Sequence, residues 1–171
     1  SVLYAGTWRM LRTPYSMESG GDGSGLWKSI DGGESWKNIS AAKGLPKGLW
    51  GIVGVTVSPS NTDKIYAILE NKDGGLFVSN DAGNSWSRVT NDHRLLQRAW
   101  YYIELFTDPQ NDQTIYVLSA PALRSKDGGR TWENLFGTHG DYHDLWINPL
   151  NNKNMIISND GGSAISVNYA R

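Results

Sequence analysis

The sequence predicts an all-β protein built from repeated antiparallel sheets, and three observations support this prediction. No long segment keeps the 3.6-residue apolar period of an amphipathic helix. Short segments rich in Val, Ile, Tyr and Trp alternate with clusters of Gly, Asn, Asp and Pro, which is typical of strands joined by tight turns. Two turn motifs also recur in a fixed order along the 171 residues, which indicates a repeat architecture.

The first recurring motif is a short turn that contains proline and asparagine. It occurs at Ser58–Asn61, Asp108–Asn111 and Asn148–Asn151, and each copy follows an apolar segment. Proline fixes φ at one position of the turn, and asparagine tolerates the tight return of the chain. Each copy therefore predicts a corner between two antiparallel strands.

The second motif is Ser-x-Asp-x-Gly-x-Ser/Thr-Trp. Its aspartate can accept N–H groups across the turn, its glycine can take a positive φ, and its tryptophan can cover the base of the hairpin. We expect each copy to be a structural turn, because a calcium-binding loop needs several more oxygen ligands at alternating positions. The three copies contain Ser29, Asp31, Gly33 and Trp36; Ser79, Asp81, Gly83 and Trp86; and Ser125, Asp127, Gly129 and Trp132.

The two motifs alternate, and their alternation predicts a four-stranded blade. The proline turn joins the first two strands of a blade, and the aspartate turn joins the last two. A repeat of roughly forty to fifty residues with four strands suits the blades of a β-propeller. The sequence therefore predicts a β-propeller of four-stranded antiparallel blades, with about four consecutive blades in this chain.

Both ends of the sequence depart from the repeat. Val2–Ala5 matches the second strand of a blade whose first strand is missing, and Ser166–Arg171 matches a degenerate aspartate turn. We expect blades near residues 1–39, 40–89, 90–135 and 136–171, of which the first and last are incomplete. Four partial blades leave strand edges and blade faces exposed. The expected partners are therefore the remaining blades of a larger ring, in the same or another chain.

Composition excludes several classes of function. The 16 Lys and Arg residues nearly balance the 17 Asp and Glu residues, so the net charge of -1 gives no field that would attract nucleic acid. The absence of cysteine excludes disulfides and thiolate chemistry. No apolar stretch is long enough for a membrane helix, so we expect no membrane insertion by this segment.

The aspartate turns resemble the Asp-box, or BNR, repeat of sialidases, sortilin-type receptor domains, xyloglucan-type glycoside hydrolases and a photosystem assembly factor. Other stretches are similar to a bacterial sortilin-like, glycosyl hydrolase-like propeller family: Arg12–Pro14, Gln97–Tyr102, His139–Trp146 and Asn159–Gly162. The resemblance implies an extracellular or periplasmic location, although no signal peptide is visible. No catalytic residue of the family can be matched onto a position of this sequence.

Ligands of propellers bind to the loops that crowd one face near the axis. Here those loops are expected at Ser40–Trp50, Asn91–Ala99 and Phe136–Tyr142, together with the insertion Thr7–Gly25. Their aromatic residues can stack on a ligand, but large aromatics also fill the interfaces between blades. The candidate residues of a ligand-binding face are Trp8, Arg12, Trp50, His93, Arg98, Trp100, Tyr101, His139, Asp141 and His143.

Histidine and aspartate gather near the C-terminal end of the chain. His139, Asp141 and Asp160 could ligate a divalent cation such as calcium, although no cofactor is otherwise expected. Strand alternation would send His143 and Asp144 to opposite faces, which weakens a joint metal site. The alternative is a network of hydrogen bonds that caps the strand ends near the axis.

Two functions remain open. The first is a noncatalytic interaction or scaffold propeller that binds a protein or glycan, as part of a larger secreted protein or assembly. The alternative is a secreted glycoside hydrolase or other carbohydrate-processing enzyme, with Asp141 and Asp160 as the candidate carboxyl pair, since glycoside hydrolysis needs two facing carboxyl groups. An open aromatic cleft with two facing carboxylates would favour the enzyme, and axial carboxylates bound by arginine or backbone would favour the scaffold.

Overall fold

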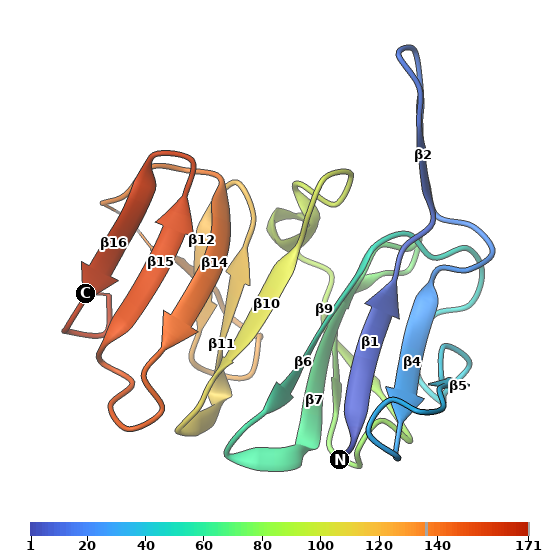
Figure 1. Cartoon of the computed structure of the whole chain (residues 1–171), viewed down its shortest axis with the longest axis horizontal. Helices are drawn as coiled ribbons and strands as arrows, with labels where there is room; N and C mark the ends of the chain where they lie inside the picture. The colour runs from blue at the N-terminus through green and yellow to red at the C-terminus, as the bar shows by residue number, and fades with distance from the viewer. Residues whose placement is uncertain (136, 171) are drawn as a thin grey trace.

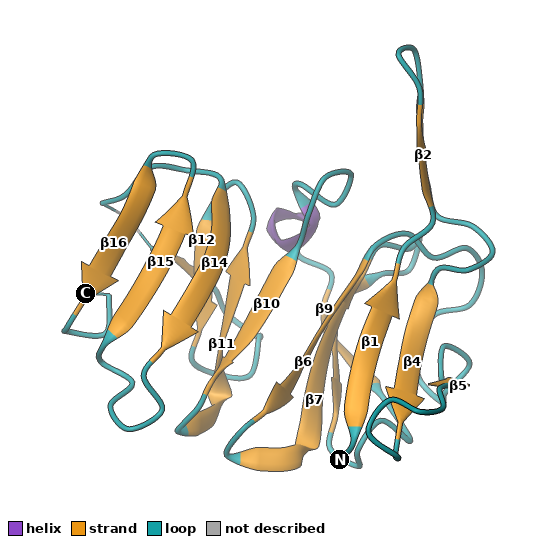
Figure 2. Cartoon of the chain, in the orientation of Figure 1, coloured by secondary structure: helices purple, strands orange, loops and turns teal. Residues whose placement is uncertain are grey.

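The computed structural model describes residues 1–135 and 137–170, and it confirms the all-β prediction (Figures 1 and 2). Within these residues the only helix is a short 3₁₀ helix, η1 (His93–Leu96). No helix in the described part of the chain is long and apolar enough to span a membrane. Phe136 and Arg171, which the expected loop and the degenerate turn include, lie outside the described residues.

Two four-stranded antiparallel sheets form the middle of the chain, and their strands follow one another in sequence order. Each begins with a strand that ends at a proline turn, and each closes its third and fourth strands with an aspartate turn. The first of these sheets contains β6 (Val53–Ser58), β7 (Asn61–Leu69), β8 (Gly75–Ser79) and β9 (Ser87–Thr90). The second contains β10 (Glu104–Asp108), β11 (Asn111–Leu118), β12 (Ala122–Ser125) and β13 (Glu133–Asn134).

A three-stranded sheet lies at either side of this pair. The first joins β1 (Leu3–Thr7), β4 (Gly25–Ser29) and β5 (Lys37–Asn38), and the last joins β14 (Tyr142–Ile147), β15 (Met155–Asn159) and β16 (Gly162–Ser166). An aspartate turn joins β4 to β5, so these correspond to the third and fourth strands of a full blade. Since β1 pairs with β4, it corresponds to the second strand. A separate hairpin of β2 (Met10–Arg12) and β3 (Met17–Ser19) projects from the first sheet (Figure 1).

The sheets stand side by side as consecutive blades of a partial propeller (Figure 1). Their first strands are neighbours in space, since β6 contacts β10 and β10 contacts β14. Figure 2 shows that η1 and the β2–β3 hairpin rise from the same edge of the sheets. The predicted fold of antiparallel partial blades is therefore confirmed, and the loops at this edge position the candidate site.

Apolar residues from neighbouring sheets form three cores, one at each junction. Strand alternation makes this possible, because successive side chains point to opposite faces and so reach both neighbours. Each fully buried Leu or Ile contributes about 2 kcal/mol relative to an exposed one. The three cores include Leu26, Ile65 and Phe77; Tyr66, Leu76, Ile115 and Leu123; and Tyr116, Leu118, Leu145 and Met155.

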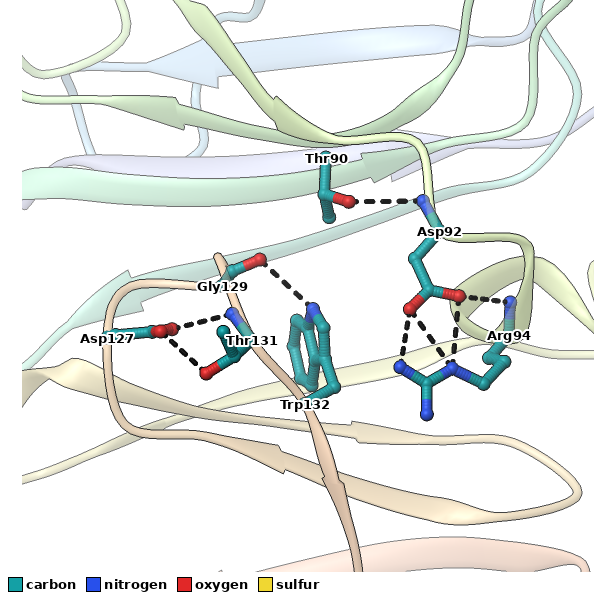
Figure 3. A network of polar contacts seen from close by, with 7 residues as sticks. All are labelled: Thr90, Asp92, Arg94, Asp127, Gly129, Thr131 and Trp132. Atoms are coloured by element: carbon teal, nitrogen blue, oxygen red, sulfur yellow. Dashed lines mark hydrogen bonds and ion pairs between the residues drawn. The ribbon is translucent and has the colours of Figure 1, made fainter.

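The three aspartate turns share one pattern of hydrogen bonds, and Figure 3 shows part of the third copy, without Ser125. Asp127 Oδ1 accepts the N–H of Thr131 at 2.9 Å, and its Oδ2 accepts the Thr131 hydroxyl at 2.6 Å. The Ser125 hydroxyl accepts the N–H of Gly129 at 2.8 Å, and the indole of Trp132 donates to the Gly129 carbonyl at 3.0 Å. Equivalent bonds hold the copies that begin at Ser29 and Ser79.

The degenerate turn forms part of the same pattern with different residues. Ser166 Oγ lies 3.0 Å from Asn168 Oδ1 and accepts the N–H of Ala170 at 2.7 Å. Tyr169 and Ala170 take φ values of 70° and 52°, in the region where the other copies use Gly or Ala. Asparagine thus replaces the aspartate, and Ala170 adopts a conformation that glycine would take with less strain.

Candidate functional site

Four segments meet at the loop edge, and hydrogen bonds between the backbones of three of them fix their relative positions. The N–H of Asp141 donates to the Ala120 carbonyl, and the N–H of Asp160 donates to the Asp141 carbonyl, both at 3.1 Å. The segment that follows η1 reaches this point through Arg98. We call the side chains gathered here the Arg98–Asp160 cluster, which consists of Arg98, Trp100, Tyr101, Tyr102, Asp141, His143 and Asp160.

Arg98 and Asp141 form an ion pair between two loops. Arg98 Nη2 lies 2.7 Å from Asp141 Oδ1 and 2.9 Å from Oδ2, with both side chains about a quarter exposed. Asp141 has a φ of 56°, which an aspartate tolerates better than most residues. The Arg98 guanidinium also lies 5.5 Å from the centre of the Trp100 ring. The ion pair therefore holds the guanidinium beside an aromatic ring.

The aromatic run after Arg98 owes its position to η1. The Asp92 side chain caps this helix by accepting the N–H of Arg94 at 3.0 Å, and it also binds the Arg94 guanidinium (Figure 3). Leu95 and Ala99 are buried in the core and anchor the segment. The N–H groups of Tyr101 and Tyr102 then both donate to the Arg98 carbonyl at 2.8 Å, which makes a compact turn.

The three aromatic rings are in contact with one another. The Trp100 and Tyr101 centroids lie 5.8 Å apart with a tilt of 32°, and the Tyr101 and Tyr102 rings meet edge to face at 5.2 Å. Trp100 and Tyr101 remain 45% and 52% exposed, whereas the Tyr102 hydroxyl is buried. Desolvation, together with nearby Asp141, raises the pKa of Tyr102 to about 12. Tyr102 is therefore a supporting residue beneath two exposed rings.

His143 connects the aromatic run to Asp160. Its Nε2 lies 2.7 Å from Asp160 Oδ1, and its ring lies 4.9 Å from that of Tyr102. The alternation expected to send His143 and Asp144 to opposite faces is interrupted here, because the register of β14 shifts between Tyr142 and Asp144. A bulge of this kind interrupts strand alternation, and both residues are exposed.

Glu104 adds a carboxyl group beside His143. Although Glu104 is exposed, the surrounding protein partly desolvates it and raises its pKa, and Asp144 raises it further, while His143 opposes the shift. Sequence inspection missed both Glu104 and Tyr102. The sequence did contain a signal for Glu104, because Glu104 and Asp144 occupy the same position in successive repeats. Each lies four residues before the first residue of a proline turn.

Among the described residues no three acidic or histidine side chains form a group that could hold a metal ion, so the geometry gives no support to the metal site predicted at His139, Asp141 and Asp160. Asp141 faces Arg98 and Asp160 faces His143, so their oxygens do not converge. His139 is exposed and its Nδ1 lies 3.0 Å from the Gly140 carbonyl. The hydrogen-bonded alternative describes these side chains better.

Five predicted residues of the ligand-binding face lie outside the cluster, namely His139 and four others. Trp50 is buried in a core, where its indole donates to the Pro46 carbonyl at 3.0 Å, so it packs between blades and is not a free stacking surface. Trp8 donates to the Ser19 hydroxyl at 2.9 Å. Arg12 lies on the exposed β2 strand, and His93 begins η1 with its side chain exposed.

Comparisons with known proteins agree on the fold. Neither a family model nor a curated protein matches the sequence. An ancestral GH74 enzyme is similar to 96% of this chain, with a TM-score of 0.60 and 18% identity, and the GH74 enzyme of Niastella koreensis to 91%, with the same TM-score and identity. YCF48, solved with a bound D1 peptide, is similar to 84% of the chain, with a TM-score of 0.52 and 15% identity.

These neighbours are much longer than the region they share with this chain. The chain spans 23% and 26% of the two GH74 enzymes and 47% of YCF48. At such low identities the similarity establishes the architecture and not the chemistry. The chain has the β-propeller architecture of the GH74 and YCF48 structures.

Proposed function

We propose that this chain is part of a noncatalytic propeller whose loop face binds a protein or a glycan. The observation that carries the proposal is that both candidate acids already have charged or basic partners, Asp141 in Arg98 and Asp160 in His143. Hydrolysis of a glycosidic bond needs one carboxyl group that gives a proton and another that attacks or activates water. Two carboxylates that already bind basic side chains are better suited to positioning loops.

Three other features support a binding role. The turns match the Asp-box repeat in sequence, and the proposed assignment to that repeat and to a secreted location follows from this likeness. One protein of the same architecture was solved with a peptide bound. The Arg98–Asp160 cluster also presents exposed aromatic rings next to polar groups, which is a common composition of recognition surfaces.

Further blades are the second proposed partner. Trp146, Ile156 and Ile165 form a cross-strand row on the last sheet and are 52%, 43% and 75% exposed. The equivalent row on the preceding sheet, which includes Phe106 and Tyr116, is packed against the last sheet. This repetition supports coverage of the exposed row by another sheet, in the same or another chain.

A glycoside hydrolase is the competing proposal, and one observation favours it. The raised pKa of Glu104 is the property expected of a general acid, and this residue lies close to His143 and Asp144. Two neighbours are GH74 enzymes, which is compatible with this alternative.

The proposal is tested by incubating the purified chain with soluble polysaccharides and measuring new reducing ends. We expect none above the level of the Glu104→Gln and Asp160→Asn variants. In parallel, arrays of glycans and peptides should retain the chain, and Arg98→Ala should abolish retention. Arg130→Ala is the matched control, because Arg130 is an exposed arginine of an aspartate turn and lies outside the cluster. If the chain hydrolyses a polysaccharide and Glu104→Gln abolishes this activity, the chain is an enzyme. If Arg98→Ala is still retained on the arrays, the binding site lies outside the cluster.

A further inference from the structure

Trp100 and Tyr101 form an exposed platform at the loop edge. The two residues are about half exposed, and their rings lie 5.8 Å apart with a tilt of 32°, so both aromatic side chains are accessible to a ligand. Among the described residues of segments 91–103 and 137–144, they are the exposed large hydrophobic residues. A stable protein interface buries about 800 Å² on each partner around an apolar centre. Two exposed rings in these segments form a small apolar area, which suits a smaller ligand.

The platform is held in place before any ligand arrives. Asp141 fixes the Arg98 guanidinium, which lies beside Trp100, and the Tyr102 ring supports Tyr101 edge-on. Both tyrosine N–H groups are bound to the Arg98 carbonyl, so the backbone cannot rotate freely. Rigid aromatic groups lose little conformational entropy on binding, which favours affinity for a flat ligand.

Ring contacts connect the platform to two polar side chains. Tyr102 contacts His143, and His143 is bonded to Asp160. The His143 and Asp160 side chains are 40% and 56% exposed, so they retain capacity for further hydrogen bonds. Carboxylates form strong hydrogen bonds with hydroxyl donors.

The charges around the platform indicate which class of ligand can bind there. Four carboxyl groups lie in or beside the cluster, namely those of Glu104, Asp141, Asp144 and Asp160, against one guanidinium and one imidazole. The guanidinium is already paired with Asp141. An anionic ligand would therefore meet mostly negative charge, whereas a neutral ligand would not be repelled.

We propose that the Trp100–Tyr101 platform binds a pyranose ring of a neutral glycan, with His143 and Asp160 as hydrogen-bonding partners of its hydroxyl groups. The C–H groups on the flat side of a pyranose carry a small positive charge, which the electron-rich faces of Trp100 and Tyr101 attract. The hydroxyl groups at the ring edge are donors that Asp160 can accept. This inference rests on the proposed binding function and names the ligand class of the same loop face.

The test is a glycan array that displays neutral, acidic and amino sugars, followed by calorimetric titration with the neutral oligosaccharide that binds most tightly. We expect neutral glycans to bind and uronate-containing or sulfated glycans not to bind. Tyr101→Ala should weaken binding about tenfold, in line with the contribution of an aromatic contact. Tyr101→Trp should retain binding, because it preserves the aromatic face.

Tyr15→Ala is the matched control, because Tyr15 is 96% exposed on the β2–β3 hairpin and lies outside the cluster. It should bind the same oligosaccharide with unchanged affinity. Preference for acidic glycans, absence of any glycan binding, or equal effects of Tyr101→Ala and Tyr15→Ala would overturn the inference. Binding of peptides alone, lost in Arg98→Ala, would overturn the glycan inference and leave the proposed binding function intact. Cleavage of a bound neutral glycan would overturn the noncatalytic proposal and leave the ligand class intact.

Discussion

A single aspartate organises each of the repeated turns. In the third copy, Asp127 accepts N–H groups from Arg130 and Thr131 and hydroxyl groups from Ser125 and Thr131. Burial opposes ionisation of Asp127, but the hydrogen bonds led by Thr131 outweigh it and hold the pKa at about 2. Hydrogen bonds from Ser85 likewise lower the pKa of Asp81 to about 2. The charged carboxylate is therefore part of the folded structure.

This arrangement predicts a pH-dependent effect of replacing Asp127. The folded-state pKa lies below the ordinary value of 3.8, so the ionised carboxylate stabilises the fold above pH 4, and this stabilisation is lost as the pH falls toward 2. Asp127→Asn should lower the free energy of unfolding by about 1 kcal/mol at pH 7. Urea unfolding at pH 7, 4 and 3 should show the difference from wild type shrinking as the pH falls.

Asp22→Asn is the control, because Asp22 is exposed and lies outside the aspartate turns. Its stability should differ little from that of wild type at each pH. A stability difference for Asp127→Asn that stays constant from pH 7 to pH 3 would contradict the role assigned to its charge.

Individual side chains were predictable where a repeat defined their place. The aspartates, glycines and tryptophans of the turns occur at fixed spacing, so their partners followed from the sequence. Trp50 was not predictable in the same way, because a tryptophan in a loop can face either solvent or a core, and only the packing against β7 and β8 decides between them. The partner of Asp141 also depends on a loop conformation that the sequence leaves open.

At the scale of elements, local irregularities decide which side chains meet. The bulge in β14 interrupts the regular alternation at His143 and Asp144, both of which are exposed. The capped helix η1 sets the direction of Trp100 and Tyr101, although four residues of 3₁₀ helix leave no strong sequence pattern. The regular strands were thus easier to predict than the site they support.

The loop before β6 contains a repeated Lys-Gly-Leu sequence that offers a matched pair of glycines. Gly44 and Gly48 both have a positive φ, of 90° and 89°. A Cβ atom at Gly44 would lie 1.7 Å from the Trp86 carbonyl oxygen, whereas one at Gly48 would have nothing within 4 Å. The close approach at Gly44 accompanies a hydrogen bond from the Trp86 N–H to the Lys43 carbonyl at 2.8 Å.

This geometry predicts different costs for the same substitution. Gly48→Ala should lower the free energy of unfolding by about 1 kcal/mol, because only the backbone conformation is strained. Gly44→Ala should lower it by about 3 kcal/mol, because the backbone must also move away from Trp86. Thermal unfolding followed by circular dichroism measures both. Equal losses of stability would mean that the loop does not pack against the β6–β9 sheet as described.

Across the whole molecule, polar side chains at two of the three junctions between sheets bind the aspartate-type turn of the sheet that follows. Tyr4 and Lys28 of the first sheet both donate to the Ala82 carbonyl, at 2.8 and 2.7 Å. Arg124 of the β10–β13 sheet donates to the carbonyl of Tyr169, which occupies in the degenerate turn the position that Ala82 occupies in its own turn. Repetition therefore extends from the turns to the junctions. The fold was predictable from the sequence because these junctions repeat, whereas the ligand-binding loops differ from blade to blade.

The contacts of Arg124 predict how strongly the stability of the last sheet depends on the preceding sheet. Its side chain is 4% exposed, its Nε lies 2.7 Å from Glu133, and its guanidinium lies over the Tyr169 ring. Arg124→Met should lower the free energy of unfolding by about 2 kcal/mol, because hydrogen bonds to a charged group are lost and the Tyr169 carbonyl loses its donor. Hydrogen exchange should speed up in β14, β15 and β16 and remain unchanged in β6 to β9.

Lys126→Met is the matched control, because Lys126 binds the same Glu133 carboxylate at 2.7 Å but is 49% exposed. An exposed ion pair contributes at most about 1 kcal/mol, so this variant should leave exchange in β14 to β16 close to that of wild type. If both variants accelerated exchange equally, the effect would come from the loss of charge beside Glu133. Faster exchange in Arg124→Met alone would show that the buried guanidinium couples the last two sheets, as expected of a repeat protein stabilised by contacts between neighbours.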